Sequence, residues 1–332
     1  MCLKTIHYKF GKSMSDEFIK TKLNWDGIFY EKTGKKLAKI SKIIQKTCYV
    51  CSNNNSKIIS NFFGINYRRC KVCDHVFAER RLSEQQLTKF YSENKTYMTN
   101  PYSQKKLINV RKNIFSPKID FIKQFTSGKK WLDVGSGDGI APYVTKKNGF
   151  DVKGLELSNV SRLFARKHLK INLINKTLLD FSYENHDKFD IISFFGVLEH
   201  IPDPARELKL SNKLLQKNGL VAFSVPHYNS VSSYTQILTQ NPDRHLLPYL
   251  HIMLFTLNSA KYLLKKSGFR PIAVWFWGMD MIEILKYFNS CDKKFANSIL
   301  KNILVKNLNS FQQILDQSQL SDEFLIIGKK IK

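Results

Sequence analysis

The sequence predicts an α/β protein with a doubly wound, mostly parallel, seven-stranded sheet, preceded by a small zinc ribbon. From residue 131 onward, short apolar runs alternate with segments of helical periodicity, which builds a parallel sheet with helices on both faces. Ahead of them, two C-x-x-C pairs lie in a segment with few aliphatic residues. A length of 332 residues accommodates one large domain and one or two small ones.

Composition limits the classes of protein that the chain can belong to. With 43% hydrophobic residues, it can build a sizeable core. No apolar run reaches the roughly 18 residues of a membrane span. The first ten residues lack the apolar core of a signal peptide. We therefore expect a cytoplasmic protein.

The net charge of +26 is uneven along the chain. Residues 1–130 hold 27 Lys and Arg against 9 Asp and Glu, whereas residues 131–332 hold 26 against 18. Such a basic N-terminal region can contact nucleic acid, an acidic partner or phosphate-bearing substrates. The favoured explanation of this charge is that lysines are scattered over solvated faces, since adjacent arginines occur only at 68–69 and 80–81.

Residues 1–47 are predicted to form a basic N-terminal extension without a clear strand pattern. Leu37, Ile40, Ile43 and Ile44 recur at helical spacing and predict one short amphipathic helix.

Residues 48–100 are predicted to form the zinc ribbon. Their cysteines follow the pattern C-x2-C-x18-C-x2-C, in which each pair forms a knuckle and two knuckles complete a closed, structural zinc site. Two strands, at 57–63 and 64–69, should connect the knuckles. A redox pair is the alternative, but the doubled motif favours zinc. His75 is a weak substitute ligand. The predicted metal ligands are Cys48, Cys51, Cys70 and Cys73.

Residues 101–130 are predicted to form a connecting helix that is interrupted near Pro117. A short helix should precede it, because Ser83 and Gln86 form a capping box.

The stretch 131–139 includes most of the first strand of the predicted sheet, 130–134, and the glycine loop that follows this strand. A strand, three glycines and a helix N-terminus can cradle a polar ligand with free N–H groups. The third glycine, Gly139, comes one residue earlier than in a dinucleotide fingerprint. The strand also carries Asp133, whose carboxylate suits a cationic sulfonium better than a pyrophosphate.

The second strand, 152–156, ends in an acid. Glu156 follows Gly139 by 17 residues, and its carboxylate can accept hydrogen bonds from both hydroxyls of a ribose. The third strand is expected at 171–174. The loop that follows carries Asp180, an acid that can accept a hydrogen bond, and Phe181, whose ring can cover a flat ligand.

The fourth strand, 189–194, leads into Gly196, Val197, Glu199 and His200 at the edge where open α/β sheets bind ligands. For His200, a general base and a structural role are evenly balanced. The fifth strand, 220–225, leads to His227 and a 230–251 insert that contains His251. The sixth and seventh strands, 269–277 and 323–329, flank a pair of inserted helices at 278–320.

Two of these motifs together resemble a known family. The glycine loop is similar to motif I of the class I S-adenosylmethionine (SAM) methyltransferases, and the string F-D-x-I…L-E-H-I-x-D-P, which begins at Phe189, is similar to their motif IV. The resemblance covers residues 48 to about 275 and implies a Rossmann-like fold. With its ribbon, the chain looks like the methyltransferases of sugar and polysaccharide pathways, whose tyrosines near the active site match Tyr91, Tyr97 and Tyr102.

The resemblance also implies site residues. The SAM contacts would be Asp133, Gly135, Ser136, Gly137, Gly139, Glu156, Leu157, Asp180, Phe181, Gly196 and Val197. The candidate bases are His200, then His251 and His227. Leu250 stands where sugar C-methyltransferases carry a catalytic glutamate, and this departure favours an oxygen acceptor.

The sequence thus predicts a SAM-dependent methyltransferase domain over residues 131–332 that acts on a small molecule, such as a sugar or a cell-surface glycan precursor. An RNA methyltransferase that uses the basic ribbon is the first alternative. A non-catalytic SAM-binding or scaffold protein is the second.

Overall fold

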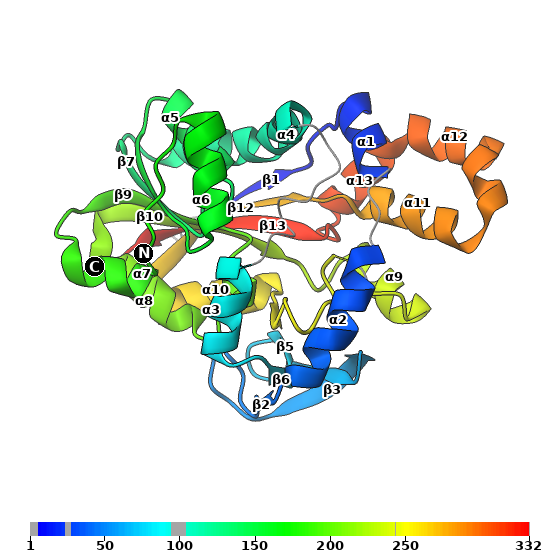
Figure 1. Cartoon of the computed structure of the whole chain (residues 1–332), viewed down its shortest axis with the longest axis horizontal. Coiled ribbons are helices and arrows are strands. Elements are labelled where there is room, and N and C mark those ends of the chain that lie inside the picture. The colour runs from blue at the N-terminus through cyan, green and yellow to red at the C-terminus, as the bar shows by residue number, and fades with distance from the viewer. Residues whose placement is uncertain (1–5, 24–27, 94–103, 243, 332) are drawn as a thin grey trace. The chain divides into compact units, whose positions relative to one another are not determined.

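A seven-stranded, mostly parallel sheet organises the fold, as predicted, in the order β1-β12-β13-β10-β9-β7-β8 (Figure 1). We describe it from a computed structural model that covers residues 6–23, 28–93, 104–242 and 244–331. The pairs β1/β12, β10/β9, β7/β9 and β7/β8 are parallel. The strands are β1 (His7–Phe10), β7 (Lys130–Val134), β8 (Asp151–Leu155), β9 (Phe189–Phe195), β10 (Leu215–Pro226), β12 (Phe269–Trp277) and β13 (Glu323–Lys330).

One predicted strand is replaced by another. Residues 171–174 make only an isolated bridge, between Leu155 and Ile174, so the prediction of a strand there is wrong. Lys170 just before them adopts a left-handed conformation, with φ of 58°, as the preceding helix ends. The seventh strand is instead β1, which lies in the extension where no strand was expected. At four residues, three of them exposed, it is too short for its alternation of polar and apolar residues to stand out in the lysine-rich extension.

The chain divides into two units. One comprises residues 82–224, 261–272 and 326–332; the other comprises residues 1–81, 225–260 and 273–325. The strands β10, β12 and β13 contribute residues to both. The domain limits drawn from the sequence stay a prediction, and each unit is described by itself.

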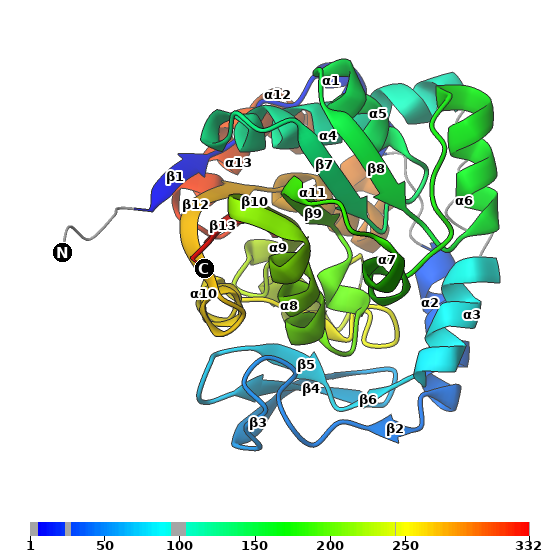
Figure 2. The same cartoon turned by 90° about the vertical axis from the view of Figure 1, so that its left-hand side faces the viewer.

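The first unit holds the glycine loop and its surroundings. Buried on both faces, β7 has fully buried Trp131 and Leu132, which is why it reads as a continuous apolar run. Figure 2 shows α4 and α5 on one face of the sheet, with α7 and α8 on the other. The helices are α3 (Glu84–Glu93), α4 (Gln104–Ile122), α5 (Ile140–Lys147), α6 (Asn159–Phe164), α7 (Leu178–Glu184), α8 (Pro204–Leu214) and α10 (Leu257–Lys266).

The connecting helix continues through its proline. The expected interruption near Pro117 is wrong, because α4 is one α-helix from Gln104 to Ile122. The buried residues Ile119, Phe121 and Ile122 anchor the turn after the proline, so packing holds the helix together where local preference would break it.

The second unit contains the cysteine-rich sheet, in the order β11-β5-β4-β3, and the two-stranded sheet β2-β6. The two connecting strands predicted there are confirmed as β3 and β4. The helix predicted over Leu37–Ile44 ends at Ile40, because Ile43 and Ile44 pair with Arg81 and Arg80. The elements are β2 (Ile43–Ile44), β3 (Ser56–Phe62), β4 (Ile65–Cys70), β5 (Val76–Ala78), β6 (Arg80–Arg81), β11 (Met253–Leu254), α1 (Asp16–Leu23), α2 (Ile28–Ile40) and α9 (Val231–Thr239).

The inserted segment at 278–320 also belongs to the second unit. It was predicted as a pair of helices, and it contains three α-helices and a 3-10 turn: α11 (Asp280–Cys291), η5 (Lys293–Asn297), α12 (Ile299–Lys306) and α13 (Leu308–Gln317). None of the described helices of the chain is long and apolar enough to span a bilayer.

Candidate functional site

The glycine loop joins β7 to α5 beside the carboxyl end of β9. Gly135 has a φ of 70°, and a Cβ atom on it would lie 2.7 Å from Cγ2 of Val197. Only glycine fits there, because both the backbone conformation and the space exclude a side chain. The loop is tied down by Ser136, whose backbone N–H donates to the carbonyl of Leu155 at 2.9 Å. The structure therefore brings the loop, β8 and Val197 together.

Glu156 follows β8 and turns its carboxylate toward the loop. One oxygen accepts from the backbone N–H of Gly137 and the other from that of Ser158, both at 2.7 Å. Burial raises the pKa of this carboxyl, while those two hydrogen bonds oppose the rise. Each carboxylate oxygen can accept a second hydrogen bond, so the group stays competent to bind two hydroxyls.

Asp133 lies under the loop, 2% exposed. Its Oδ1 accepts from the Ser193 hydroxyl at 2.6 Å, and that hydroxyl accepts from the Trp131 indole N–H at 2.8 Å. Burial raises the pKa of Asp133 to about 7, although the serine hydroxyl opposes this. Its charge therefore changes near neutral pH.

A buried lysine on α4 was not among the site residues predicted from the sequence. Lys118 is 3% exposed and donates from Nζ to Oγ of Ser224 on β10 at 2.8 Å. The carbonyl of Ser224 accepts from the N–H of Gly196 at 3.0 Å, so the ammonium lies near the start of the loop after β9. A signal was present: Lys118 stands between Ile114 and Ile122 at four-residue spacing, on the apolar stripe of the helix.

A second contact ties α4 to the glycine loop. Nε of Arg111 lies 3.1 Å from Oδ2 of Asp138, whose side chain is 6% exposed. Oδ1 of the same carboxylate accepts from the N–H of Ile140, the first residue of α5. The helix that precedes the sheet thus helps to set the conformation of the loop.

His200 lies in a short 3-10 turn, Leu198–His200, just after β9. Its Nδ1 is 2.9 Å from the hydroxyl of Tyr91, and its Nε2 is 4.0 Å from Oε1 of Glu199. Glu199 is buried, and 15% of the His200 side chain is exposed. The ring is therefore held from two sides. Of the tyrosines that the resemblance pointed to, Tyr97 and Tyr102 lie outside the described residues.

The two other candidate bases belong to the second unit. His227 packs between the rings of Phe276 and Phe324, and its Nδ1 lies 3.0 Å from the carbonyl of Ser321. Burial lowers the pKa of His227 to about 4. Nδ1 of His251 lies 2.9 Å from the carbonyl of His245. In both rings a carbonyl fixes the proton on Nδ1.

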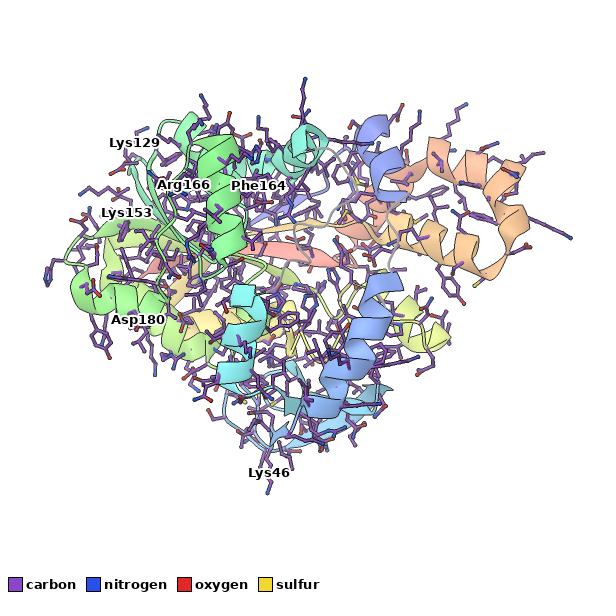
Figure 3. All side chains as sticks on the ribbon, viewed as in Figure 1. Lys46, Lys129, Lys153, Phe164, Arg166 and Asp180 are labelled. Carbon is purple, nitrogen blue, oxygen red and sulfur yellow. The ribbon has the colours of Figure 1, made fainter. Side chains whose placement is uncertain are left out.

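The remaining predicted cofactor contacts spread along the same edge of the sheet. Leu157 is half-buried, and its carbonyl accepts from the Arg162 guanidinium at 2.6 Å. Gly196 is exposed, whereas Phe181 is 6% exposed. The exposed Asp180, labelled in Figure 3, lies in the first turn of α7, where its carboxylate accepts from the Thr177 hydroxyl at 2.7 Å.

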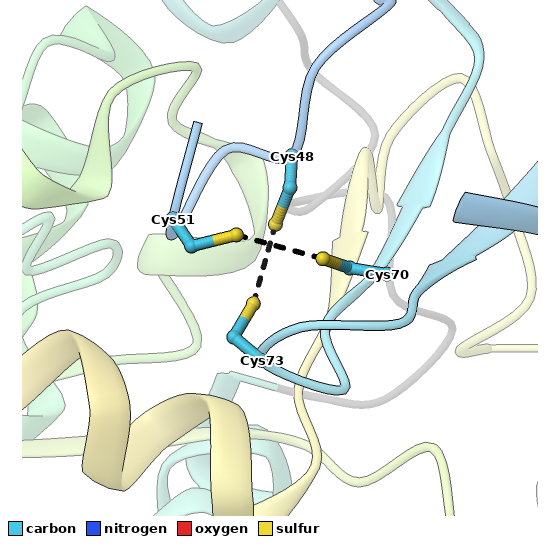
Figure 4. Close-up of side chains that lie close together, drawn as sticks. All are labelled: Cys48, Cys51, Cys70 and Cys73. Atoms are coloured by element: carbon cyan, nitrogen blue, oxygen red, sulfur yellow. Dashed lines mark hydrogen bonds between the residues drawn. The ribbon is translucent and has the colours of Figure 1, made fainter. Parts of the chain in front are cut away.

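The four predicted metal ligands converge in the second unit (Figure 4). Their sulfur atoms all lie within 4.8 Å of one another, with Cys48 3.4 Å from Cys73 and Cys51 3.5 Å from Cys70. Tetrahedral Zn²⁺ with Zn–S bonds of about 2.3 Å separates its sulfurs by about 3.8 Å. The donor set and its spacing therefore fit Zn²⁺, and the cysteine tetrad can bind it.

The knuckle geometry supports the same fit. The backbone N–H groups of Val50 and Val72 donate to the sulfurs of Cys48 and Cys70, both at 3.4 Å. Such bonds stabilise thiolates that a metal has deprotonated. His75 is fully buried, stacks on Phe77 and packs at a tilt against Phe255. It is not among the residues whose ligand atoms form the group.

Comparison with known proteins settles the family. A family model described as a methyltransferase domain matches residues 108–274, just over half of the chain. The chain belongs to this methyltransferase family. It contains a class I SAM-dependent methyltransferase domain, as the glycine loop and the motif that begins at Phe189 predicted.

Two relatives are both named ubiquinone biosynthesis O-methyltransferase. The one from Hydrogenovibrio crunogenus is 28% identical over 194 residues, which are 55% of this chain and 79% of that protein. The one from Pasteurella multocida is 37% identical over 112 residues, 30% of this chain and 46% of that protein. Apart from the Hydrogenovibrio crunogenus protein, the curated relatives compared with the chain are matched over about half of their length. These names do not point to a sugar pathway.

Solved structures that the chain is similar to include a SAM-dependent methyltransferase from Archaeoglobus fulgidus, 17% identical, with a TM-score of 0.46 over 66% of this chain and 94% of that one. Another is the magnesium protoporphyrin IX methyltransferase of Synechocystis PCC 6803 with bound S-adenosylhomocysteine (SAH), 9% identical, with a TM-score of 0.48 over 75% of this chain and all of that one.

Proposed function

We propose that the chain transfers the methyl group of SAM to an oxygen atom of a small-molecule acceptor. The observation that carries this proposal is the carboxylate of Glu156, which two backbone N–H groups aim across the glycine loop. Its free lone pairs suit the two hydroxyls of the cofactor ribose. The membership of the chain in the methyltransferase family supports the same assignment.

Two further groups suit the amino-acid part of SAM. Asp133 offers a carboxylate beneath the loop, which attracts the cationic part of the cofactor when it is ionised. Lys118 offers a buried ammonium near Gly196, which can hold the carboxylate of the methionine part. The adenine would lie toward Phe181, with Asp180 as an acceptor for its amino group.

SAM supplies a methyl group that its sulfonium already activates, so the protein mainly has to hold both reactants in line. His200 acts as the base. In the tautomer that carries its proton on Nδ1, 2.9 Å from the Tyr91 hydroxyl, Nε2 can accept the proton of the acceptor hydroxyl. Glu199, 4.0 Å away, stabilises the imidazolium that results. The acceptor oxygen bonds to the methyl carbon, and the electrons of the broken C–S bond remain on sulfur in SAH.

The acceptor class follows from two lines of support. The relatives are named for O-methylation in ubiquinone biosynthesis, which favours a hydroxylated ring compound. The ribbon and Leu250 favour a sugar or glycan precursor that is methylated on oxygen. Both classes of acceptor are small molecules that take the methyl group on a hydroxyl oxygen. Both would use His200 as the base.

Labelled methyl transfer tests the proposal. The full chain, loaded with Zn²⁺, would be incubated with methyl-labelled SAM and, in separate reactions, polyhydroxylated phenols, nucleotide sugars and total RNA. Label in a phenol or a sugar is the expected result, and it chooses between the two classes. Label in RNA alone would replace the proposal with the alternative based on the basic N-terminal region.

A further inference from the structure

The inserted helices of the second unit present apolar side chains outward. In α12, Ile299 is 78% exposed, Leu300 54% and Ile303 50%, and no residue of the helix is buried. Its three half-buried residues, Lys301, Leu304 and Val305, lie on the opposite side of the helix. In Figure 1 this helix lies at the right-hand end of the picture, beside α11.

The next helix, α13, has its polarity inverted. Its buried residues are Leu308, Gln312 and Asp316, whereas Phe311 and Ile314 are 37% and 58% exposed. A surface helix normally buries its apolar stripe and exposes its polar one. Two apolar residues therefore stay in contact with water while an amide and a carboxylate are buried.

Hydrogen bonds fix that inverted orientation. Nε2 of Gln312 donates to Oδ1 of Asp316 at 2.9 Å and to Oδ2 of Asp280 on α11 at 3.1 Å. The hydroxyl of Ser321 donates to Asp316 at 2.6 Å. Turning α13 to hide Phe311 and Ile314 would break these buried bonds, and leaving their partners unsatisfied is costly. The outward apolar face is thus built into the unit.

The same stretch is cationic. Residues 293–315 contain no Asp or Glu and four lysines, Lys293, Lys294, Lys301 and Lys306. Lys294 and Lys306 are exposed, and Lys306 follows Ile299 and Ile303 on the same helical face. Apolar side chains bordered by lysines are typical of helices that lie in the interface of a bilayer with anionic lipids.

We propose that the α12–α13 face, formed by Ile299, Leu300, Ile303, Phe311 and Ile314, docks peripherally on an anionic membrane surface. The apolar side chains stand on outward faces of two helices, which a fluid bilayer can accommodate without a matching shape. A second copy of the chain would bring its lysines against these lysines, and like charges repel. A nucleic acid would satisfy the lysines and leave Ile299, Ile303 and Ile314 in water. Of these three occupants, the bilayer alone suits both kinds of side chain.

Co-sedimentation of the full, zinc-loaded chain with vesicles tests this. The vesicles contain phosphatidylglycerol and phosphatidylcholine in equal parts, or phosphatidylcholine alone. Binding is expected to the anionic vesicles and to weaken with salt. Ile299→Ser/Ile303→Ser should lower the association constant for anionic vesicles by about tenfold or more. Lys294→Gln/Lys306→Gln should lower it by a similar factor.

The matched control is Ile58→Ser/Leu238→Ser, which removes two apolar residues that are 54% and 85% exposed outside the insert. It should bind as the unchanged chain does. Circular dichroism checks that each variant is folded. Equal binding by all variants would overturn the proposal, as would no binding to anionic vesicles at low salt, which would leave a protein partner as the occupant. A dimer in light scattering that Ile299→Ser/Ile303→Ser dissolves would also overturn it, in favour of a second copy.

Discussion

At the residue scale, the proposed cofactor site contains groups whose charge the fold adjusts. Asp133 is buried beneath the loop and Glu156 is aimed by backbone N–H groups. Burial raises the pKa of both, so each is protonated more readily than a carboxyl in water. Lys118 sets a buried positive charge on the same edge of the sheet.

The affinity for SAM should depend on pH through Asp133. The pKa of this carboxyl is about 7, so its ionised fraction rises about tenfold between roughly pH 6 and pH 8. If the ionised form binds the cation, affinity for SAM increases with pH by up to about tenfold. Calorimetry at several pH values measures this. Asp133→Asn should bind more weakly and show a flat profile; a profile as steep as that of the unchanged chain would contradict the assignment.

One substitution tests the proposed base without changing the proposed cofactor site. His200→Gln should lower kcat by about 10²–10⁴-fold while affinity for SAH stays within about twofold, because in the proposed mechanism the ring removes a proton and does not hold the cofactor. Tyr91→Phe removes the hydroxyl beside Nδ1 and should shift the pH profile of kcat. The measurement is steady-state kinetics of the labelled transfer. Full activity in His200→Gln would return the role to His251 or His227.

The sequence predicted the glycine loop, Glu156 and the four cysteines as sites because each signal is local and consists of residue types at a recognisable spacing. It did not show Lys118 beside Ser224, or Ser193 beneath Asp133. Those pairs join residues 106 and 60 positions apart, and only the packing of the sheet brings them together. The position of Lys118 on an apolar helical stripe was the one available hint.

At the element scale, the cysteine tetrad adds to a hydrophobic core that includes Phe62, Ile65 and Tyr67. The four sulfurs join the knuckle before β3 to the knuckle after β4. Zn²⁺ bound by this tetrad would add to the folding free energy of the small sheet.

Loss of one ligand should therefore loosen the ribbon. Cys70→Ser is expected to lower Zn²⁺ affinity by more than about 100-fold, beyond the cost of losing an indirect partner of a metal ligand. Zinc content by mass spectrometry and thermal unfolding measure this. Cys291→Ser is the matched control, since Cys291 is exposed and lies outside the tetrad. Full zinc content in Cys70→Ser would rule out the four-cysteine site.

Elements with strong periodicity were predictable, and those made by pairing alone were not. The buried strands β7, β9 and β12 read directly from their apolar runs. The strand β1 is an edge strand with mostly exposed residues, so it forms because β12 offers a free edge. In α4 the sequence signal was misleading, because tertiary packing of Ile119 and Phe121 outweighs the effect of Pro117.

At the scale of the whole molecule, stability should respond to a buried acidic network in the second unit. Asp280, Asp316 and Asp322 are almost fully buried around Gln312 and Arg244. Burial raises the pKa of Asp280 to about 7, that of Asp316 to about 6, and that of Asp322 as well. A sequence cannot reveal this network, because its members lie on three different elements.

The sign of the effect follows from linkage. A carboxyl whose folded pKa is raised contributes stability that is fully present below its unfolded pKa of about 4 and is lost as pH rises through the folded value. Asp316→Asn keeps the oxygen that accepts from Gln312 and Ser321 and removes the titration. Relative to the unchanged chain, this variant should gain about 1–3 kcal/mol between about pH 4 and pH 8. Urea unfolding at both pH values measures it, and a constant difference would contradict the account.

Cofactor binding itself gives the most direct test of the central claim, that this chain is a SAM-dependent methyltransferase whose Glu156 holds the ribose. Calorimetric titration of the zinc-loaded chain with SAH should show one site. Glu156→Ala should weaken it by about 100-fold, because two hydrogen bonds to a charged group are lost. Glu184→Ala, which removes a largely exposed acid on α7, should leave it unchanged. No SAH binding by the unchanged chain, or equal binding by Glu156→Ala, would contradict the account.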